Sequence, residues 1–172
     1  IEITLTFPQG LYKINDDGEM EATYADFKIQ GRVHVDGNEV RNSKIYGSSY
    51  YVGGVYGAST YIYDMFLIDS EVHGTTADTY AVGGISGYES GYGLMYRCGV
   101  INSTITNPGD RTGGIVGYTY NNHHIYFNLV DGTTVSGNNK VGGMVGEAFG
   151  NTVLRYGRLS DTKVIAANNF AG

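Results

Sequence analysis

Four copies of a glycine-rich hexapeptide decide the fold of this chain: Val52-Gly53-Gly54-Val55-Tyr56-Gly57, Val82-Gly83-Gly84-Ile85-Ser86-Gly87, Thr112-Gly113-Gly114-Ile115-Val116-Gly117 and Val141-Gly142-Gly143-Met144-Val145-Gly146. Their first residues lie 30, 30 and 29 positions apart, and the four copies hold 12 of the 27 glycines. A period of this length indicates a repeat protein, in which each unit completes its core by stacking on the next.

A second element follows each hexapeptide and keeps the same period. It has an apolar residue, then an Asn or Asp two positions later, a small residue, and a closing apolar residue. Its copies are Leu67-Ile68-Asp69-Ser70-Glu71-Val72, Val100-Ile101-Asn102-Ser103-Thr104-Ile105, Leu129-Val130-Asp131-Gly132-Thr133-Thr134-Val135 and Leu159-Ser160-Asp161-Thr162-Lys163-Val164, with a fainter forerunner at Val40-Arg41-Asn42-Ser43-Lys44-Ile45. The third copy carries one extra residue. Two elements in phase over four periods indicate equivalent, stacked rungs.

The runs between corner residues are β-branched and aromatic, and no apolar stripe has helical spacing. We therefore predict an all-β chain that forms a parallel β-solenoid of about five rungs, with about 30 residues and three short strands in each rung. Each strand would pair with its copy in the next rung at roughly 4.8 Å.

Alignment of the second element predicts which side chains stack. One inward apolar ladder should contain Leu67, Val100, Leu129 and Leu159. The core position two residues earlier should hold Met65, Cys98, Phe127 and Gly157, which makes Cys98 a buried core residue rather than a nucleophile. A corner suited to Asx side chains should hold Asn42, Asp69, Asn102, Asp131 and Asp161. The next, small position should hold Ser43, Ser70, Ser103, Gly132 and Thr162.

Residues 1–26 break the period. Residues 1–7 alternate apolar and polar side chains, and Asn15-Asp16-Asp17-Gly18 is typical of a hairpin turn. We assign residues 1–26 to N-terminal capping or linking strands and residues 27–172 to the solenoid, with a first irregular rung near residue 27. A fifth hexapeptide is due at residues 169–172, and neither a signal peptide nor a polar cap is visible. We expect the chain to be a piece of a longer protein, with its repeats truncated at the C-terminus.

Composition excludes two classes of partner. The net charge is −6 and the eleven basic residues are scattered, which disfavours binding to nucleic acid. No run of about 18 apolar residues is present, so we expect no membrane insertion.

The pattern Val-Gly-Gly-apolar-x-Gly, followed by a short strand and an Asn/Asp-Ser/Thr corner, resembles the GLUG-type repeat of bacterial extracellular proteins. It is especially similar to the non-catalytic β-helix of the bacterial IgA-cleaving zinc metallopeptidase family, and the likeness covers residues 40–172. The resemblance implies a right-handed parallel β-helix in a secreted or cell-surface protein. The peptidase domain of that family needs a His-Glu-x-x-His motif, which this chain lacks.

We predict no catalytic residues, no metal site and no cofactor. The adjacent His123 and His124 would point to opposite faces of a strand, and we interpret the four histidines as exposed loop residues without a structural role. No Gly-x-Ser-x-Gly elbow recurs among the repeats, and no helix follows the glycines to bind a phosphate. An enzymatic alternative remains, because Asp69, Asp131 and Asp161 could approach across rungs as the carboxyl pair of a polysaccharide lyase or hydrolase. Such an enzyme would bind its polysaccharide in a groove along one face of the solenoid, and the insertion at residues 74–80 would form a loop beside that groove. Calcium at the Asx corner is a further alternative.

The sixteen tyrosines are the best indication of binding, because Tyr offers amphipathic contact area at a modest entropy cost. The predicted binding residues are Tyr50, Tyr51, Tyr61, Tyr118 and Tyr120. The competing interpretation places about half of the tyrosines in the core or over sheet edges. We expect a rigid spacer or adhesive segment whose partners are a host protein or glycan and neighbouring domains of the same polypeptide. An ice-binding function would require regular rows of threonine on one flat face. It is disfavoured because the threonines of this chain do not form such a row.

Overall fold

The computed structural model describes residues 12–14, 20–22, 38–168 and 170–171. Contacts divide the chain into two compact units, residues 1–30 and 31–172. In the first unit, β1 (Tyr12–Ile14) and β2 (Met20–Ala22) pair antiparallel. They flank the predicted turn at residues 15–18, which itself lies outside the described residues. The predicted strand at residues 1–7, the boundary after residue 26, the rung near residue 27 and His34 also lie outside them.

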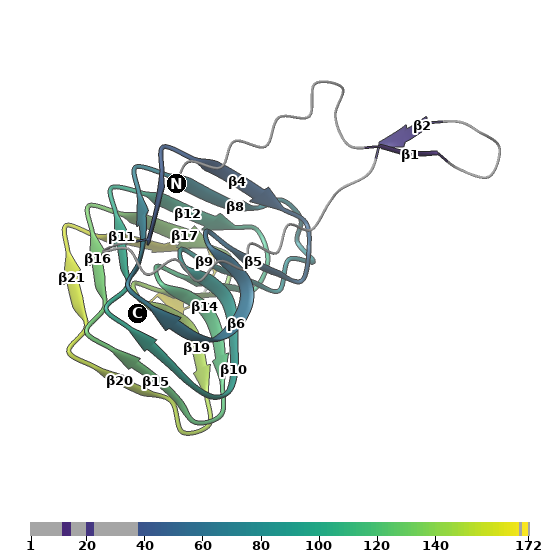
Figure 1. The fold of residues 1–172 in the computed structure, drawn as a ribbon. Helices are drawn as coiled ribbons and strands as arrows, with labels where there is room; N and C mark the ends of the chain where they lie inside the picture. Colours follow the sequence, from purple (N-terminus) through teal and green to yellow (C-terminus); the bar gives the residue numbers. More distant parts are fainter. Residues whose placement is uncertain (1–11, 15–19, 23–37, 169, 172) are drawn as a thin grey trace. The chain divides into compact units, whose positions relative to one another are not determined.

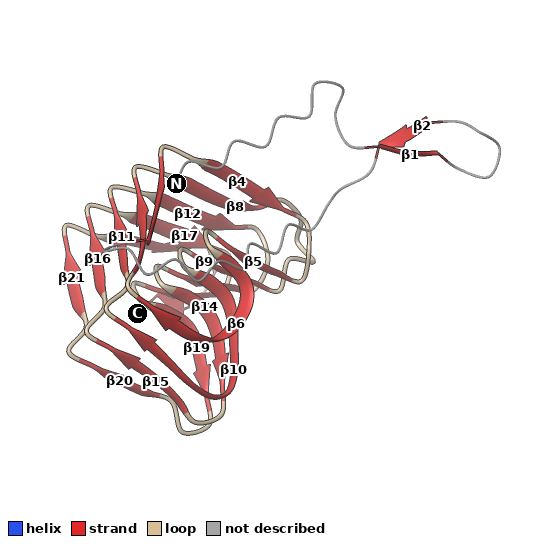
Figure 2. Ribbon diagram, viewed as in Figure 1, coloured by secondary structure: helices blue, strands red, loops and turns tan. Residues whose placement is uncertain are grey.

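The second unit is a right-handed parallel β-helix, as predicted, with about four rungs instead of the five expected (Figures 1 and 2). The first sheet contains β3 (Asn38–Arg41), β7 (Met65–Ile68), β11 (Gly99–Ile101), β16 (Leu129–Asp131) and β21 (Arg158–Ser160). The second sheet contains β4 (Lys44–Gly47), β8 (Glu71–Gly74), β12 (Thr104–Asn107), β17 (Thr134–Gly137) and β22 (Lys163–Ala166). The third sheet contains β5 (Tyr51–Gly53), β9 (Ala81–Gly83), β13 (Arg111–Gly113), β18 (Lys140–Gly142) and β23 (Phe170–Ala171).

The fourth sheet shows that three strands per rung was an underestimate. It contains the long strands β6 (Tyr56–Tyr63) and β10 (Ser86–Tyr96), and in later rungs these give way to two strands each. The shorter strands are β14 (Val116–Tyr120), β15 (His123–Tyr126), β19 (Val145–Phe149) and β20 (Val153–Arg155). The Gly-Gly pair of each hexapeptide is the cause, because it forms a corner between the third and fourth sheets. A Cβ on Gly113 would collide with Val116 O across that corner.

The apolar column of the first sheet corrects one predicted residue. Leu67 pairs with Val100, Val100 pairs with Val130, and Val130 pairs with Leu159. Leu67, Val100 and Leu159 therefore share a column as predicted, whereas Leu129 pairs with Gly99 and is only half buried. The third copy contains no extra residue inside the motif; its match simply begins at Val130.

The corner column explains that shift. Its residues have a left-handed backbone with φ between 45° and 55°, and they are Asn42, Asp69, Asn102, Gly132 and Asp161. The prediction of Asp131 at this corner was wrong, because Gly132 adopts the left-handed conformation that Asn and Asp supply elsewhere. Asp131 belongs to β16 and pairs with Ile101 and Ser160.

A ladder of hydroxyl groups follows the corner. Its members are Ser43, Ser70, Ser103, Thr133 and Thr162, so Thr133 takes the place predicted for Gly132. The Ser43 amide donates to Ser70 Oγ at 3.0 Å, and Ser70 Oγ donates to Ile68 O at 2.7 Å. The hydroxyl groups from Ser70 to Thr162 thus each join two rungs, whereas that of Ser43 donates to Arg41 O in its own rung. Each satisfies a backbone group that the corner would otherwise leave unpaired.

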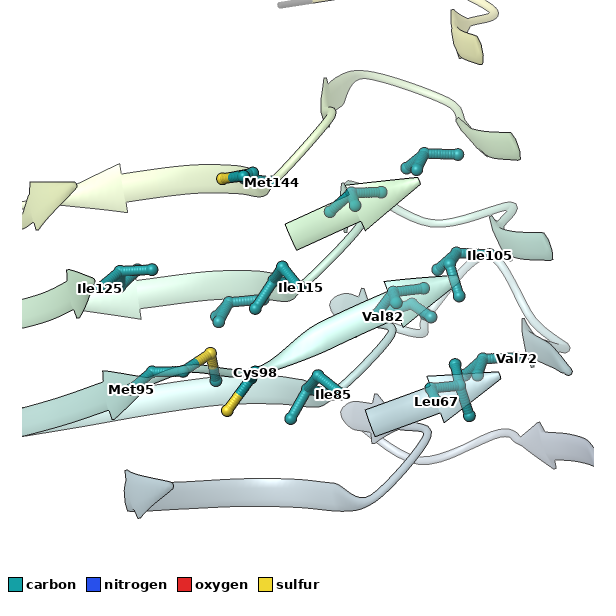
Figure 3. Packing of buried hydrophobic residues seen from close by; sticks show 14 of the residues in the cluster. Leu67, Val72, Val82, Ile85, Met95, Cys98, Ile105, Ile115, Ile125 and Met144 are labelled. Atoms are coloured by element: carbon teal, nitrogen blue, oxygen red, sulfur yellow. The ribbon is translucent and has the colours of Figure 1, made fainter. Parts of the chain in front are cut away.

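The core follows the solenoid axis and consists of aliphatic and sulfur-containing side chains (Figure 3). Cys98 is buried in it, as predicted. The prediction of Phe127 beside it was wrong: Phe127 is exposed, and Asn128 takes the inward position. The Cys98 amide donates to Asn128 Oδ1 at 2.7 Å, which gives this buried amide side chain a backbone partner.

Candidate functional site: a tyrosine cluster

Four of the five predicted binding tyrosines lie in one continuous group of aromatic rings. We define this tyrosine cluster as Tyr50, Tyr51, Tyr80, Tyr88, Tyr118, Tyr120 and Phe149, each in contact with at least one other member. The cluster covers the corner between the third and fourth sheets, where β5, β10, β14 and β19 supply most of its rings. Tyr61, the fifth predicted residue, lies on β6 and is 60% exposed, but it has no ring contact with the cluster.

The rings stack because equivalent positions of successive rungs are one strand spacing apart. The Tyr50 and Tyr80 ring centroids lie 4.5 Å apart with planes 7° from parallel. Tyr88 and Tyr118 are likewise equivalent and stack at 5.4 Å across the β10–β14 pair. Tyr51, in contrast, stacks on Tyr88 at 4.5 Å from a different position, since the equivalent of Tyr88 in the preceding rung is Ala58. These separations are close to the distance between neighbouring strands. The inner rings therefore cover one another's faces and leave their edges and hydroxyl groups toward the outside.

The ends of the cluster carry its most exposed rings. Tyr50 is 57% exposed at one end, and Phe149 is 56% exposed at the other. Phe149 stacks on Tyr120 at 5.3 Å with planes 3° from parallel. A ligand that needs an open aromatic face would therefore meet it at these two ends.

A buried guanidinium holds the centre of the cluster together. Arg111, on β13, is only 8% exposed, and its Cζ lies 3.8 Å from the Tyr80 ring centroid and 4.9 Å from that of Tyr118. Its Nη1 lies 2.6 Å from Asp110 Oδ2, and its Nε donates to Glu147. The cation–π contacts and both ion pairs fix the planes of the rings against the sheet.

The charges around Arg111 balance. Lys140 Nζ lies 2.8 Å from Glu147 Oε1, so two cations face two carboxylates. Burial favours the neutral form of Glu147, but Lys140 and Arg111 outweigh it and hold its pKa below the usual value. Burial and its tyrosine neighbours raise the pKa of Tyr118, which keeps its phenol protonated. The cluster is consequently rich in hydroxyl groups and carries no net charge.

Sequence reasoning missed this charged group, although a signal was present. Arg111 and Lys140 each stand directly before the first residue of a hexapeptide, where earlier copies have Tyr51 and Ala81. The pairing of Arg111 with Ala81 and Lys140 confirms that these positions form one column. Their shared offset from the hexapeptide is the signal in the sequence that identifies this column.

The histidines differ from the prediction of exposed loop residues. His73 lies on β8, where it bonds Glu71 at 3.0 Å and Thr106 at 2.5 Å and stacks on Tyr46. His123 is buried and His124 is exposed, so these adjacent residues of β15 do point to opposite faces. His123 and His73 are structural residues of the strands.

Asp69 and Asp161, two of the carboxylates of the enzymatic alternative, lie too far apart to form a pair. Asp69 and Asp161 share the corner column but lie three rungs apart, which is about 14 Å at the strand spacing. Carboxyl pairs of glycosidases lie within about 10 Å of each other. Asp131 does not belong to that column. Among the residues that the structure describes, no group of three or more His, Cys, Asp and Glu side chains is arranged to hold a metal ion.

A shallow hollow of about 540 Å³ opens beside the second sheet. Its lining combines hydroxyl and amide groups with apolar residues: Thr106, Asn107, Pro108, Ser136, Gly137, Asn138, Ile165 and Ala167. Asn107 is buried but already donates to Thr79 O and Arg111 O. The buried polar side chain of this hollow is therefore already bonded to the backbone.

Comparison of the chain with family models, with curated proteins and with solved structures gives no match. In the described part of the chain, no helix is long and apolar enough to cross a membrane.

Proposed function

We propose that this chain is a rigid, non-catalytic module of a secreted or cell-surface bacterial protein, in which it spaces a neighbouring domain and offers the tyrosine cluster to a host glycan or protein. In a parent protein of the metallopeptidase type, the module would be accessory to the catalytic domain. The observation that carries the proposal is the single aromatic cluster formed by Tyr50, Tyr51, Tyr118 and Tyr120 on a continuous stack of rungs.

Rigidity follows from the bonding between rungs. Strands of all four sheets pair from one rung to the next, with a single change of register between β6 and β10, and the hydroxyl ladder adds side-chain bonds along the same direction. A surface on such a scaffold loses little conformational entropy when a partner binds. The same stack transmits a fixed distance and orientation to whatever domain adjoins it.

The chemistry of the cluster suits an uncharged, hydroxyl-rich partner. Stacked phenol rings offer apolar edges together with a row of hydroxyl groups that donate and accept hydrogen bonds. The balanced charges of Arg111, Lys140, Asp110 and Glu147 give no preference for a strongly charged ligand. Open ring faces at Tyr50 and Phe149 add positions where a sugar ring can stack.

Glycan arrays and immobilised host glycoproteins test the proposal. We expect the purified chain to bind a subset of neutral glycans or glycoproteins, and we expect Tyr50→Ser combined with Phe149→Ser to weaken that binding at least about tenfold. Tyr92→Ser is the matched control, because Tyr92 is 76% exposed and lies outside the cluster. The proposed surface would be contradicted if Tyr92→Ser weakened binding equally, or if the Tyr50→Ser and Phe149→Ser combination left the affinity unchanged.

Polysaccharide cleavage remains testable with the same preparation. Release of reducing or unsaturated ends from a polysaccharide panel would support the enzymatic alternative over a binding module.

A further inference from the structure

Two titratable side chains meet inside the solenoid. They lie beside the bend of the fourth sheet, which we define as the segment of β10 between Glu89 and Leu94, where its pairing with β6 changes register. Glu89 lies on β10 and His123 begins β15, and both side chains are 0% exposed. His123 Nε2 lies 3.4 Å from Glu89 Oε2. Neither carboxyl oxygen of Glu89 and neither ring nitrogen of His123 has a hydrogen-bond partner in the structure, so the two groups face each other just outside hydrogen-bonding geometry. A buried polar pair of this kind needs an explanation, because most buried polar groups are fully bonded.

The surroundings offer no counter-charge. Burial raises the pKa of Glu89 to about 8, and Ser86 opposes this rise. Burial lowers the pKa of His123 to about 4, and the neighbouring His124 acts in the same direction. The other titratable groups facing the pair are Tyr56 and Cys98, and burial raises the pKa of both, that of the thiol to about 12. Asp64 affects the pKa of Cys98, but it is bonded to Arg97 at the surface.

We propose that Glu89 and His123 form a neutral pair that shares a single proton, so that ionisation of Glu89 in mildly alkaline medium loosens the bend of the fourth sheet. In the neutral form, the protonated carboxyl donates to the imidazole and neither group is charged. An ionised pair would place two charges in the interior without the additional hydrogen bonds that make buried ion pairs tolerable.

The position of the pair makes the bend the part that responds. β6 and β10 change register between Glu89 and Leu94, and His123 pairs with Gly93 on the far side of that change. A Cβ at Gly93 would collide with the His123 ring, so the ring packs directly on the backbone of the bend. A charge on Glu89 therefore destabilises the point where the two halves of the sheet meet.

The two groups define a pH window for stability. Glu89 has a raised pKa in the folded state, so its contribution is present at low pH and is lost as the pH rises from 4.5 toward 8. His123 has a lowered pKa, so the folded state loses stability as the pH falls from 6.5 toward 4. The two effects offset each other between about pH 4.5 and 6.5. Above that plateau, only the loss from Glu89 remains.

The alkaline side gives the sharper test, since exposed carboxylates also destabilise the fold in acid. Between pH 6.5 and 8 we expect the folding equilibrium constant of the chain to fall roughly tenfold. Urea denaturation at both pH values measures this change. In Glu89→Gln, which keeps the shape and removes the titration, we expect a change of less than about twofold. Glu71→Gln, a surface variant on β8, is the control and should keep the tenfold loss.

Measurements on the unchanged chain cover the case in which Glu89→Gln fails to fold. Carbon-13 NMR of labelled glutamate side chains should show one carboxyl that titrates well above the others, together with an infrared band of a protonated acid at pH 6.5. Hydrogen-exchange protection, measured relative to the intrinsic exchange rate at each pH, should fall first in the amides flanking the bend as the pH rises. Glutamates that all titrate in the ordinary acidic range, or an alkaline loss that persists in Glu89→Gln, would overturn the shared-proton pair.

Discussion

The correction from Leu129 to Val130 gives a direct test of the rung alignment. Val130 is 0% exposed and lies between Val100 and Leu159 in the apolar column. Val130→Ala removes two buried methyl groups, which costs about 1.6 kcal/mol in lost transfer free energy. The cavity that remains adds about 1 kcal/mol, because neighbouring rungs are tied by hydrogen bonds and relax little. We expect the free energy of unfolding to fall by about 2–3 kcal/mol.

Leu129→Ala is the matched comparison, because Leu129 lies one residue away on the same strand but outside the column. It is half buried and pairs with Gly99 and Arg158, so its truncation should cost less than about 1 kcal/mol despite the removal of more atoms. Urea denaturation followed by circular dichroism measures both midpoints, and an unchanged slope would show that the unfolding reaction is the same. A larger loss in Leu129→Ala than in Val130→Ala would refute the column and with it the assignment of Gly132 to the corner.

Five further substitutions test the corners and the hydroxyl ladder beside them. Gly113→Ala should lower the free energy of unfolding by about 3 kcal/mol or more, because a Cβ there meets backbone atoms; Gly57→Ala, where the nearest backbone oxygen would be 3.2 Å away, should cost less than about half as much. Asn102→Gly should be tolerated, whereas Asn102→Val should cost about 1–2 kcal/mol, because Val disfavours the left-handed backbone that the corner requires; thermal denaturation distinguishes the two. Ser103→Ala removes an acceptor and a donor of the hydroxyl ladder and should lower the free energy of unfolding by about 1–2 kcal/mol, as measured by urea denaturation.

The repeat could be read from the sequence because the stacked rungs demand chemically similar residues at each column. The hexapeptides pair as aligned, with Val82 beside Val52 and Thr112, and Thr112 beside Val141. The alignment failed in the third copy because it matched residue types instead of backbone conformations. Gly132 and Asn102 are different residue types, but both adopt the positive φ that the corner requires.

The number of strands was harder to predict, because a glycine pair fits both a strand and a corner. Only the close approach of Gly113 to Val116 O shows that the hexapeptide turns between two sheets. The tyrosine cluster was partly visible, since Tyr enrichment indicated a surface. The place of Arg111 beneath the rings depends on contacts between rungs, which no local pattern contains. The pairing of Glu89 with His123 likewise joins residues of two rungs.

The variation in rung length points to where this repeat departs from a uniform spacer. Gly74 pairs with Gly47 and Ala81 pairs with Tyr51, so the second rung carries three extra residues between β8 and β9. A second insertion of three residues lies at the bend of β10, where the pairing with β6 changes register. The sheets stay in register on both sides, so neither insertion is needed for stacking. The first insertion lies directly before Tyr80, which is the equivalent of Tyr50; the Tyr80 ring stacks on Tyr50 and lies over the guanidinium group of Arg111. The ring at the centre of the cluster therefore occupies a regular stacked position, and the longest rung places its extra residues directly beside it, as insertions in repeat proteins form loops that gather on one face.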